Sequence, residues 1–303
     1  MRNLYRSILA FLTFICTSCY NDVVEVERFD GDVELKLHGS IDQEYSTRVD
    51  DSGFANGDAM GVYIVDYNDG VAGQITDSGL RASNVIYTYD AASNTWSTNS
   101  CVYWRDTTTP VDIYGYYPAV MCITSPDKYT FEVSDRQNGT SDGSVMSNYE
   151  ASDFLWAKAE GVSQEDGSVQ LQFKHMCSKV VIKLVKGEEY TDAFPEDIDV
   201  YLYSTVPQAL INFTTGIVSK DPHGDAQKIK ARKVAIDTFE VIVVPQSILE
   251  YAPFVEIIMG GISYMTEEIF TYHAGKEYIV SITLDNSPQK IEINIGGSVG
   301  GWE

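Results

Sequence analysis

The stretch SVQLQFKHMCSKVVIKLVKG, residues 168–187, decides the fold class. Val169, Leu171 and Phe173 alternate with polar residues, so apolar side chains recur at every second position. This period is typical of a β-strand with one buried face. The run that follows, KVVIKLVKG, is rich in Val and Ile, which fit the pleated surface of a sheet. We therefore predict two consecutive strands here.

The same pattern continues in both directions along the 303 residues. Short apolar runs are separated by Gly, Asn, Asp, Ser or Pro at spacings of roughly 8–12 residues, which is typical of β-sandwiches. We find no long amphipathic helix, and the 20 tyrosines add to the β-favouring composition. We predict an all-β chain whose strands include VELKL, AMGVYIVDY, NVIYTYD, CVYWRD, VDIYGYYPAV, KYTFEV, DFLWAKAE, DVYLYST, FEVIVVPQ, FVEIIMGG, EYIVSITL and KIEINIG.

Two changes of composition divide the chain. Residues 134–152, SDRQNGTSDGSVMSNYEAS, are the longest polar interruption, and we expect them to form either a long loop or a flexible flap within the first half. Residues 161–167, GVSQEDG, precede a fresh run of strands, so we place the domain boundary there. The prediction is an N-terminal β-sandwich over residues 49–163 and a C-terminal β-sandwich over residues 164–303.

The N-terminus resembles an export signal. Arg2 and Arg6 precede an apolar run, residues 8–16, that is far shorter than the ~20 residues of a membrane-spanning helix. Small residues and then Cys19 follow, an order that resembles the lipobox of bacterial lipoproteins, in which the cysteine is acylated. We predict a lipoprotein signal peptide over residues 1–18, with a lipid on Cys19 that anchors the chain to a membrane. The alternative is an ordinary secretory signal with an incidental cysteine.

The chain is strongly acidic, with a net charge of −23. Loss of residues 1–18 would remove two of the 21 basic residues and none of the 44 acidic ones, which leaves 19 basic residues and a charge of −25. Such a surface repels nucleic acid and anionic lipid. Binding to nucleic acid is therefore excluded as a function.

Cysteines are few after the predicted signal peptide. Besides Cys19 there are Cys101, Cys122 and Cys177, so at most one disulfide can form, and we expect buried free thiols. No C-x-x-C pair follows residue 18, and the four histidines lack the paired spacing of metal ligands. We expect neither a metal nor another cofactor.

Two motifs resemble functional sites but lack the context that those sites need. GTSDG, residues 139–143, matches the G-x-S-x-G pattern of hydrolases, but that pattern follows an apolar strand, and both flanks here are polar. DYNDG, residues 66–70, resembles part of a calcium loop, but its glycine is fifth rather than sixth and Asp77 stands in place of the glutamate. A hairpin turn explains DYNDG better. The sequence indicates no enzyme.

The aromatic residues of the first half raise the hypothesis of a sugar-binding platform. Tyr114 and Tyr116 alternate at period two within an apolar run, so packing in a sandwich core explains them without a ligand. The residues considered for the platform are Tyr103, Trp104, Tyr114, Tyr116, Tyr117 and Trp156.

Four motifs occur in the order typical of the fimbrillin family, the lipoprotein-derived subunits of type V pili on Bacteroides-like bacteria. They are FANGDAMGVYIV (residues 54–65), VYWRDTTTPVDIYGYYP (102–118), DFLWA (153–157) and LQFKHMCSKVVIKL (171–184). The resemblance is strongest over residues 45–185. It implies two tandem transthyretin-like β-sandwich domains and no enzymatic activity.

The resemblance also implies a route of assembly. In shaft subunits of the family, a trypsin-like protease cuts after a basic residue that follows the first strand, and the vacated groove accepts a strand from the next subunit. By this resemblance, residues 19–48 would be a lipidated propeptide, and the cut would fall between Arg48 and Val49. The alternative is that Arg48 is an uncut surface residue.

Both strands of this exchange can be assigned to short alternating runs. Three buried aliphatic side chains would contribute roughly 5–9 kcal/mol per junction before the cost of ordering. The residues expected to face the groove are Val33, Leu35 and Leu37 in the strand that leaves, and Ile291, Ile293 and Ile295 in the strand that enters.

The sequence thus predicts a structural pilus subunit on the outer surface of the cell. Its partners would be other pilus subunits, and the lipid on Cys19 would hold it at the outer membrane before processing. The alternatives are a non-polymerising anchor or accessory subunit, and an adhesin that binds host glycans or proteins. Shaft, tip and anchor positions all stay open.

Overall fold

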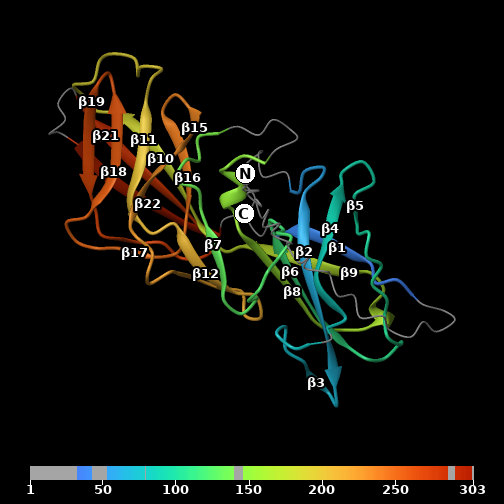
Figure 1. Ribbon diagram of the computed structural model, residues 1–303. Helices are drawn as coiled ribbons and strands as arrows, with labels where there is room; N and C mark the ends of the chain where they lie inside the picture. The colour runs from blue at the N-terminus through green and yellow to red at the C-terminus, as the bar shows by residue number, and fades with distance from the viewer. Residues whose placement is uncertain (1–32, 43–52, 79, 140–145, 286–290, 302–303) are drawn as a thin grey trace, which may run out of the picture.

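The computed structural model describes residues 33–42, 53–78, 80–139, 146–285 and 291–301. Within these ranges the chain forms strands β1 to β22 and two single-turn 3-10 helices, η1 (Glu150–Ser152) and η2 (Gln164–Asp166). The strands gather in two lobes, which Figure 1 shows side by side, with β7 and β12 between them. The predicted all-β class is confirmed.

The first lobe is built on one large sheet with the strand order β1-β9-β8-β6-β2-β4-β5, and β3 pairs with β2. Every pairing along this path is antiparallel except that of β1 with β9, which is parallel. The strands are β1 (Leu37–Ile41), β2 (Ala59–Asn68), β3 (Val71–Ala72), β4 (Ala82–Asp90), β5 (Thr95–Ser97), β6 (Val111–Tyr117), β8 (Leu155–Val162) and β9 (Val169–His175).

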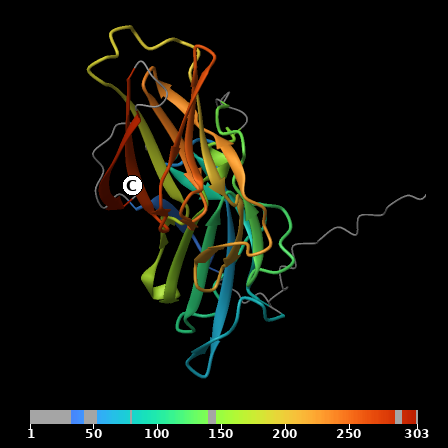
Figure 2. The same cartoon turned by 90° about the vertical axis from the view of Figure 1, so that its left-hand side faces the viewer.

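The second lobe is a sandwich of two sheets, ordered β15-β16-β10-β21-β22 and β14-β11-β18-β19. A two-stranded pair, β17 with β20, completes this lobe. Figure 2 shows it above the first lobe. The strands are β10 (Ser178–Lys186), β11 (Asp199–Thr205), β14 (Gln227–Lys230), β15 (Arg232–Ala235), β16 (Thr238–Val243), β17 (Ser247–Ile248), β18 (Pro253–Met259), β19 (Ile262–Glu267), β20 (Phe270–Thr271), β21 (Lys276–Leu284) and β22 (Ile291–Gly301).

A small third sheet joins the two lobes. It has the order β13-β12-β7, in which β7 (Tyr129–Glu132) comes from the first half of the chain, and β12 (Gln208–Asn212) and β13 (Ile217–Lys220) come from the second. Beyond β7, the buried side chain of Gln137 donates to the carbonyl of Ile242 in β16 and accepts from its N–H, both at 2.8 Å. The chain that leaves β7 is thus tied to the second lobe.

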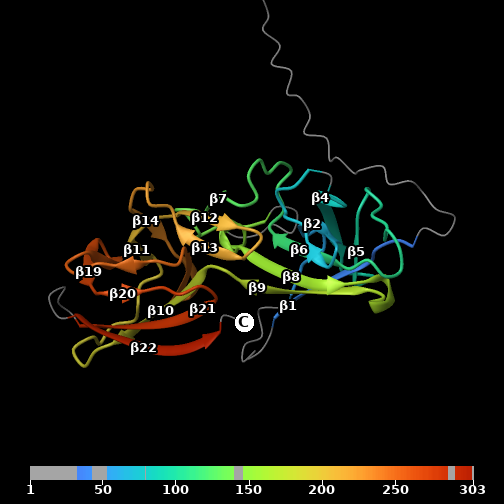
Figure 3. The same ribbon diagram turned by 90° about the horizontal axis from the view of Figure 1, so that it is seen from below.

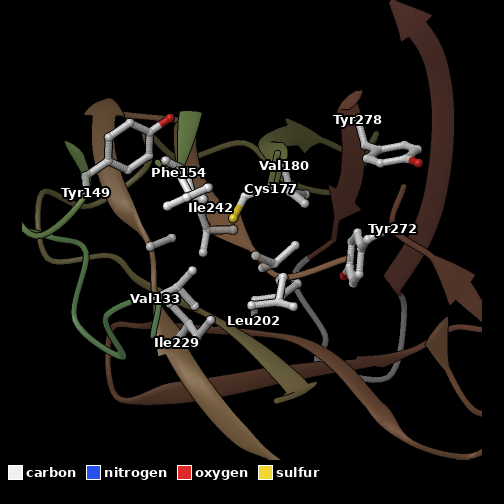
Figure 4. Packing of buried hydrophobic residues seen from close by; sticks show 14 of the residues in the cluster. Val133, Tyr149, Phe154, Cys177, Val180, Leu202, Ile229, Ile242, Tyr272 and Tyr278 are labelled. Carbon is white, nitrogen blue, oxygen red and sulfur yellow. The ribbon is translucent and has the colours of Figure 1, made fainter. Parts of the chain in front are cut away.

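Two hydrophobic cores lie on opposite faces of the first sheet. Val62 and Ile64 of β2 belong to the core of the first lobe, whereas Tyr63 and Val65, which alternate with them, belong to the core that continues into the second lobe. Figure 4 shows part of the second core, where Val180 and Ile242 from one sheet pack near Leu202 and Ile229 from the other. The first sheet is therefore covered on both sides.

The structure corrects two details of the sequence predictions and confirms a third. The boundary placed at residue 163 runs between β8 and β9, which are hydrogen-bonded neighbours in one sheet, so the first-lobe sheet extends to His175. CVYWRD forms no strand and contributes one isolated bridge at Tyr103. The hairpin turn after β2 is confirmed, because Asp69 and Gly70 both have positive φ (52° and 79°) between paired strands. The division into two transthyretin-like domains stays a prediction.

Candidate functional site: the groove of the first strand

Residues 33–41, which end in β1, lie in a groove and are hydrogen-bonded to two neighbours, one after the other along the chain. On one side β1 pairs with β9, from Leu37 opposite Val169 to Ile41 opposite Phe173. On the other side, the N–H of Leu35 donates to the carbonyl of Val102 at 2.8 Å, and the N–H of Trp104 donates to the carbonyl of Val33 at 3.0 Å. Figure 3 shows β1 beside β9 at the rim of the first lobe. We call the surface formed by β9 and residues 102–104 the β1 groove.

Two side chains of this segment enter the core of the first lobe. Leu35 and Leu37 are 1% and 2% exposed, and both belong to the core cluster that includes Leu171 and Phe173 of β9. Burial of two leucines contributes about 3–6 kcal/mol before the cost of ordering the strand. Ile41 packs against the same cluster and is partly buried. The first strand therefore completes a core that the rest of the chain leaves open.

The expectation that Val33 is buried in the groove with Leu35 and Leu37 is wrong. Its side chain is 44% exposed, although it alternates with Leu35 and Leu37. Val33 lies four residues before the start of the ladder with β9, and its carbonyl accepts a hydrogen bond from the N–H of Trp104. The paired strand is shifted towards its C-terminus relative to the prediction and covers Leu37–Ile41.

A glycine and an aromatic cluster close the far end of the groove. A Cβ atom on Gly39 would lie 3.1 Å from Cε2 of Phe173 and 3.2 Å from Nε1 of Trp96, tighter than ordinary van der Waals contact. The indole N–H of Trp96 donates to the carbonyl of Gly39 at 3.3 Å. The sequence prediction missed these residues; a glycine inside a strand pattern was the available signal of a close approach.

Phe54, which follows residues 43–52 in the sequence, also packs into this cluster. Its ring lies 4.9 Å from that of Trp96 and 5.5 Å from that of Phe173, both edge-on. It also meets Tyr117 at 5.4 Å. Because β1 ends at Ile41 and the next described residues begin at Gly53, both sides of the connecting segment contact the same aromatic cluster. Arg48 and Val49 of this segment, like Cys19, lie outside the described residues.

The carboxyl group of Asp58 lies at the edge of this aromatic cluster and accepts hydrogen bonds from two uncharged donors. The hydroxyl of Tyr117 donates to Asp58 at 3.1 Å, and the N–H of Ala55 donates to the same carboxylate at 2.7 Å. Burial raises the pKa of Asp58, and these two hydrogen bonds offset only part of that increase. Burial, and after it the charge of Asp58, raises the pKa of Tyr117. Tyr117 therefore stays a neutral donor throughout the physiological range.

The C-terminal strand of the predicted exchange lies at the edge of another sheet. β22 pairs antiparallel with β21, with Leu284 opposite Ile291, Ile282 opposite Ile293 and Val280 opposite Ile295. It is the last strand in the order of its sheet, and Figure 3 shows it along the outer side of β21. The structure does not bring the two predicted strands together within one chain, because β1 belongs to the first lobe and β22 to the second.

The aromatic residues considered for a sugar platform are mostly core residues. Trp104, Tyr114, Tyr116 and Tyr117 are all buried. Trp156 is half-buried and donates its indole N–H to the carbonyl of Phe213 at 2.8 Å. Their explanation by core packing is confirmed, and they form no exposed stacking surface.

Cysteines and potential metal ligands offer no second site. No disulfide joins Cys101, Cys122 and Cys177, all of which the structure describes. Cys177 is buried, and burial raises its pKa; Cys101 and Cys122 are exposed in loops, so the expectation of buried thiols is wrong for these two. Among the described residues, no three His, Cys, Asp or Glu side chains are grouped to hold a metal ion. In the same ranges, no helix is long and apolar enough to cross a membrane.

The sequence was compared with models of known protein families. The family model described as "Fimbrillin-like" matches residues 47–302. The chain belongs to the fimbrillin-like family. The match begins just before the predicted cleavage point and includes all of β22. The resemblance inferred from the four sequence motifs is thereby confirmed.

Solved structures share the fold of this fimbrillin-like chain. A candidate cell adhesion protein from Bacteroides uniformis superposes with a TM-score of 0.68 at 21% identity, covering 91% of this chain and all of the other. A second one, from Bacteroides ovatus, superposes with the same TM-score at 19% identity, covering 90% of this chain and 98% of the other. A comparison with curated proteins found no match.

Proposed function

We propose that this chain is a structural subunit of a surface fimbria that polymerises by exchange of β1 for a strand of the next subunit. The observation that carries the proposal is the seating of β1. Leu35 and Leu37 are buried in the first-lobe core, and residues 43–52 are the covalent link between their segment and the rest of that lobe. One cut in that segment would separate two core side chains from the domain that they complete.

Loss of β1 would leave a groove that requires a new strand. The carbonyls and N–H groups of β9 and of residues 102–104 would lose their partners, and the cavities of the two leucines would open to water. Unpaired backbone groups and exposed apolar surface both favour the addition of an extended strand from another molecule. In this proposal, cleavage after Arg48 starts assembly, and β22 of the incoming subunit supplies the strand.

Export as a lipoprotein is the second part of the proposal. The signal-like residues 1–18 and Cys19 would deliver the uncleaved chain to the outer membrane, and cleavage would release it into a pilus at the cell surface. Membership of the fimbrillin-like family supports other pilus subunits as partners and a non-catalytic role.

A non-polymerising anchor or accessory subunit is the second candidate. It is favoured by the hydrogen bonds that tie residues 33–35 to residues 102–104 and β1 to β9, which a subunit that keeps its first strand would need permanently. An adhesin that binds glycans through the first-half aromatics is disfavoured, because these side chains are mostly buried.

Substitution of the predicted cleavage residue tests the proposal. Cells producing Arg48→Ala should display an uncut chain that retains residues 19–48 and forms no polymer, whereas wild type forms heat-labile polymers. Arg105→Ala is the control, because Arg105 is an exposed arginine outside the strands and is not the predicted cleavage residue. Polymers of unchanged length and N-terminus in Arg48→Ala would contradict cleavage at this site.

A further inference from the structure

The first and last described strands carry the same residue pattern over nine positions. VELKLHGSI, residues 33–41, aligns without gaps with IEINIGGSV, residues 291–299. Glu, Gly and Ser are identical at the second, seventh and eighth positions, and aliphatic residues match at four others. The aliphatic pairs are Val33 with Ile291, Leu35 with Ile293, Leu37 with Ile295, and Ile41 with Val299.

The shared glycine stands where the β1 groove admits no side chain. Gly39 lies against Phe173 and Trp96, and a Cβ atom there would contact both at 3.1–3.3 Å. In the alignment this position is Gly297. His38, one position earlier, points away from this contact and is partly exposed, and its counterpart is Gly296. In this alignment Gly297, and not its neighbour Gly296, stands where the groove leaves no room for a side chain.

The C-terminal part of this segment of β22 is paired irregularly in its own sheet. The pairing with β21 is regular from Ile291 to Gly296, and then its register shifts, so that residues 297–299 stand opposite Tyr278 alone. In the β1 groove the equivalent residues pair one to one, with Gly39 to Ile41 opposite Leu171 to Phe173. Residues 297–299 would thus gain regular ladder partners by moving there.

We propose that the β1 groove is matched to residues 291–299 of a second copy of this chain, in the register set by Gly297 at the position of Gly39. Ile293 then takes the place of Leu35, and Ile295 the place of Leu37. A slip by two residues would keep aliphatic side chains in the core but press Ile295 or Val299 against Trp96 and Phe173. This inference rests on the proposed strand exchange and adds its partner and its register.

A strand replacement within the full chain tests the register without any polymerisation. In the first variant, residues 33–41 are replaced by IEINIGGSV. In the matched control they are replaced by QKIEINIGG, residues 289–297, which keeps Ile at positions 35 and 37 but places Ile295 at position 39. We expect the unfolding temperature of the first variant to lie within about 3 °C of that of wild type. The unfolding temperature of the control should be at least about 5 °C below that of wild type, because Ile at position 39 overpacks the groove. Equal unfolding temperatures for the two variants, whether high or low, would overturn the register.

Assembly of the processed chain tests the second copy. Gly297→Val should abolish homopolymers, whereas Gly296→Val should leave them intact, because the groove accepts His38 at that position. Equal polymerisation by both variants would overturn the proposal, as would polymers of wild type that grow only when a different subunit is added. If wild type forms no polymer of any kind, the proposed function fails, while the strand replacements still decide whether the groove accepts this register.

Discussion

β1 and β22 each lie at the edge of a sheet, one in each lobe, but they are held in different ways. β1 pairs with β9, and residues 33–35 just before it are hydrogen-bonded to residues 102–104 on the opposite side. Leu35 and Leu37 of this segment are buried in the first-lobe core. β22 pairs with β21 along one flank, and its register breaks before its end.

This difference supports the separate roles that we propose for the two edge strands. A segment that completes a core and is bonded to two neighbours stays in place until its link to the chain is cut. A strand bonded on one flank can leave with the loss of a single ladder and is free to pair elsewhere. We therefore regard β1 as the strand to be removed and β22 as the strand to be donated.

The largest expected effect concerns the apolar anchoring of β1. Leu37→Ala should lower the free energy of unfolding by about 2–5 kcal/mol, because it leaves a cavity in the first-lobe core. Val33→Ala, the control in the same segment, should lower it by less than about 1 kcal/mol, since Val33 is 44% exposed. Denaturant titration measures both. Equal losses would mean that Leu37 does not anchor the strand.

Overpacking at the aromatic end of the groove should cost somewhat less. Gly39→Val should lower the free energy of unfolding by about 1–3 kcal/mol, because the new side chain meets Phe173 and Trp96. It should also shift the fluorescence of Trp96, whose indole donates to the carbonyl of Gly39. Ser40→Val places the same side chain on the exposed face and should change neither quantity. An unaltered Gly39→Val spectrum would contradict the close approach seen here.

The sheet that carries β22 should be more sensitive to acid than the β1 groove. Lys179 of β10 lies 3.7 Å from Glu240 of β16 and 3.3 Å from Glu277 of β21, and Arg232 lies 2.6 Å from Glu240. Burial raises the pKa of Glu240, but Lys179 and Arg232 outweigh it and hold the pKa below the ordinary 4.5. Such a depressed pKa contributes stability above the unfolded pKa, and this is lost as pH falls through the folded value.

Glu240→Gln should therefore destabilise the protein most at neutral pH, by about 1–2 kcal/mol. The difference from wild type should shrink as the pH falls below 4.5, where the unfolded carboxyl group is protonated. Glu267→Gln, at an exposed position, is the control and should change little at any pH. Unfolding curves at several pH values measure this. A Glu240→Gln deficit that stays constant with pH would exclude the ionic account.

The smallest expected effect is a difference in local opening. Backbone amides of β22 should exchange with solvent at least about tenfold faster than those of Leu35 and of the β1–β9 ladder, because the register of β22 breaks before its end, whereas residues 33–41 are anchored by two buried leucines. Amides of β10, inside its sheet, serve as the slow reference. Hydrogen exchange read by mass spectrometry of short peptides separates these segments. Slower exchange in β22 than in β1 would reverse the roles assigned to them.

Local patterns allowed the strands to be predicted, but not their partners. Alternation located β9 and the apolar run of β10, and the Asp-Gly pair located the turn after β2. The parallel pairing of β1 with β9 joins residues about 130 positions apart and depends on the whole fold. For the same reason, the boundary at residue 163 cut through a sheet that composition alone cannot reveal.

The groove shows the same division between local and long-range information. The burial of Leu35 and Leu37 followed from period two, but that of Val33 did not, because it depends on where the neighbouring strand begins. Gly39 matters only because Trp96 and Phe173, distant in the sequence, converge on it. Contacts of this kind require the folded chain.

The most direct test of the account is the state of the native protein at the cell surface. Its N-terminus should be read by sequencing, and its assembly by electrophoresis with and without heating. The account predicts a chain that starts at Val49 and a ladder of polymers that collapses on heating. A population of unpolymerised chains that all begin with an acylated Cys19 would contradict it.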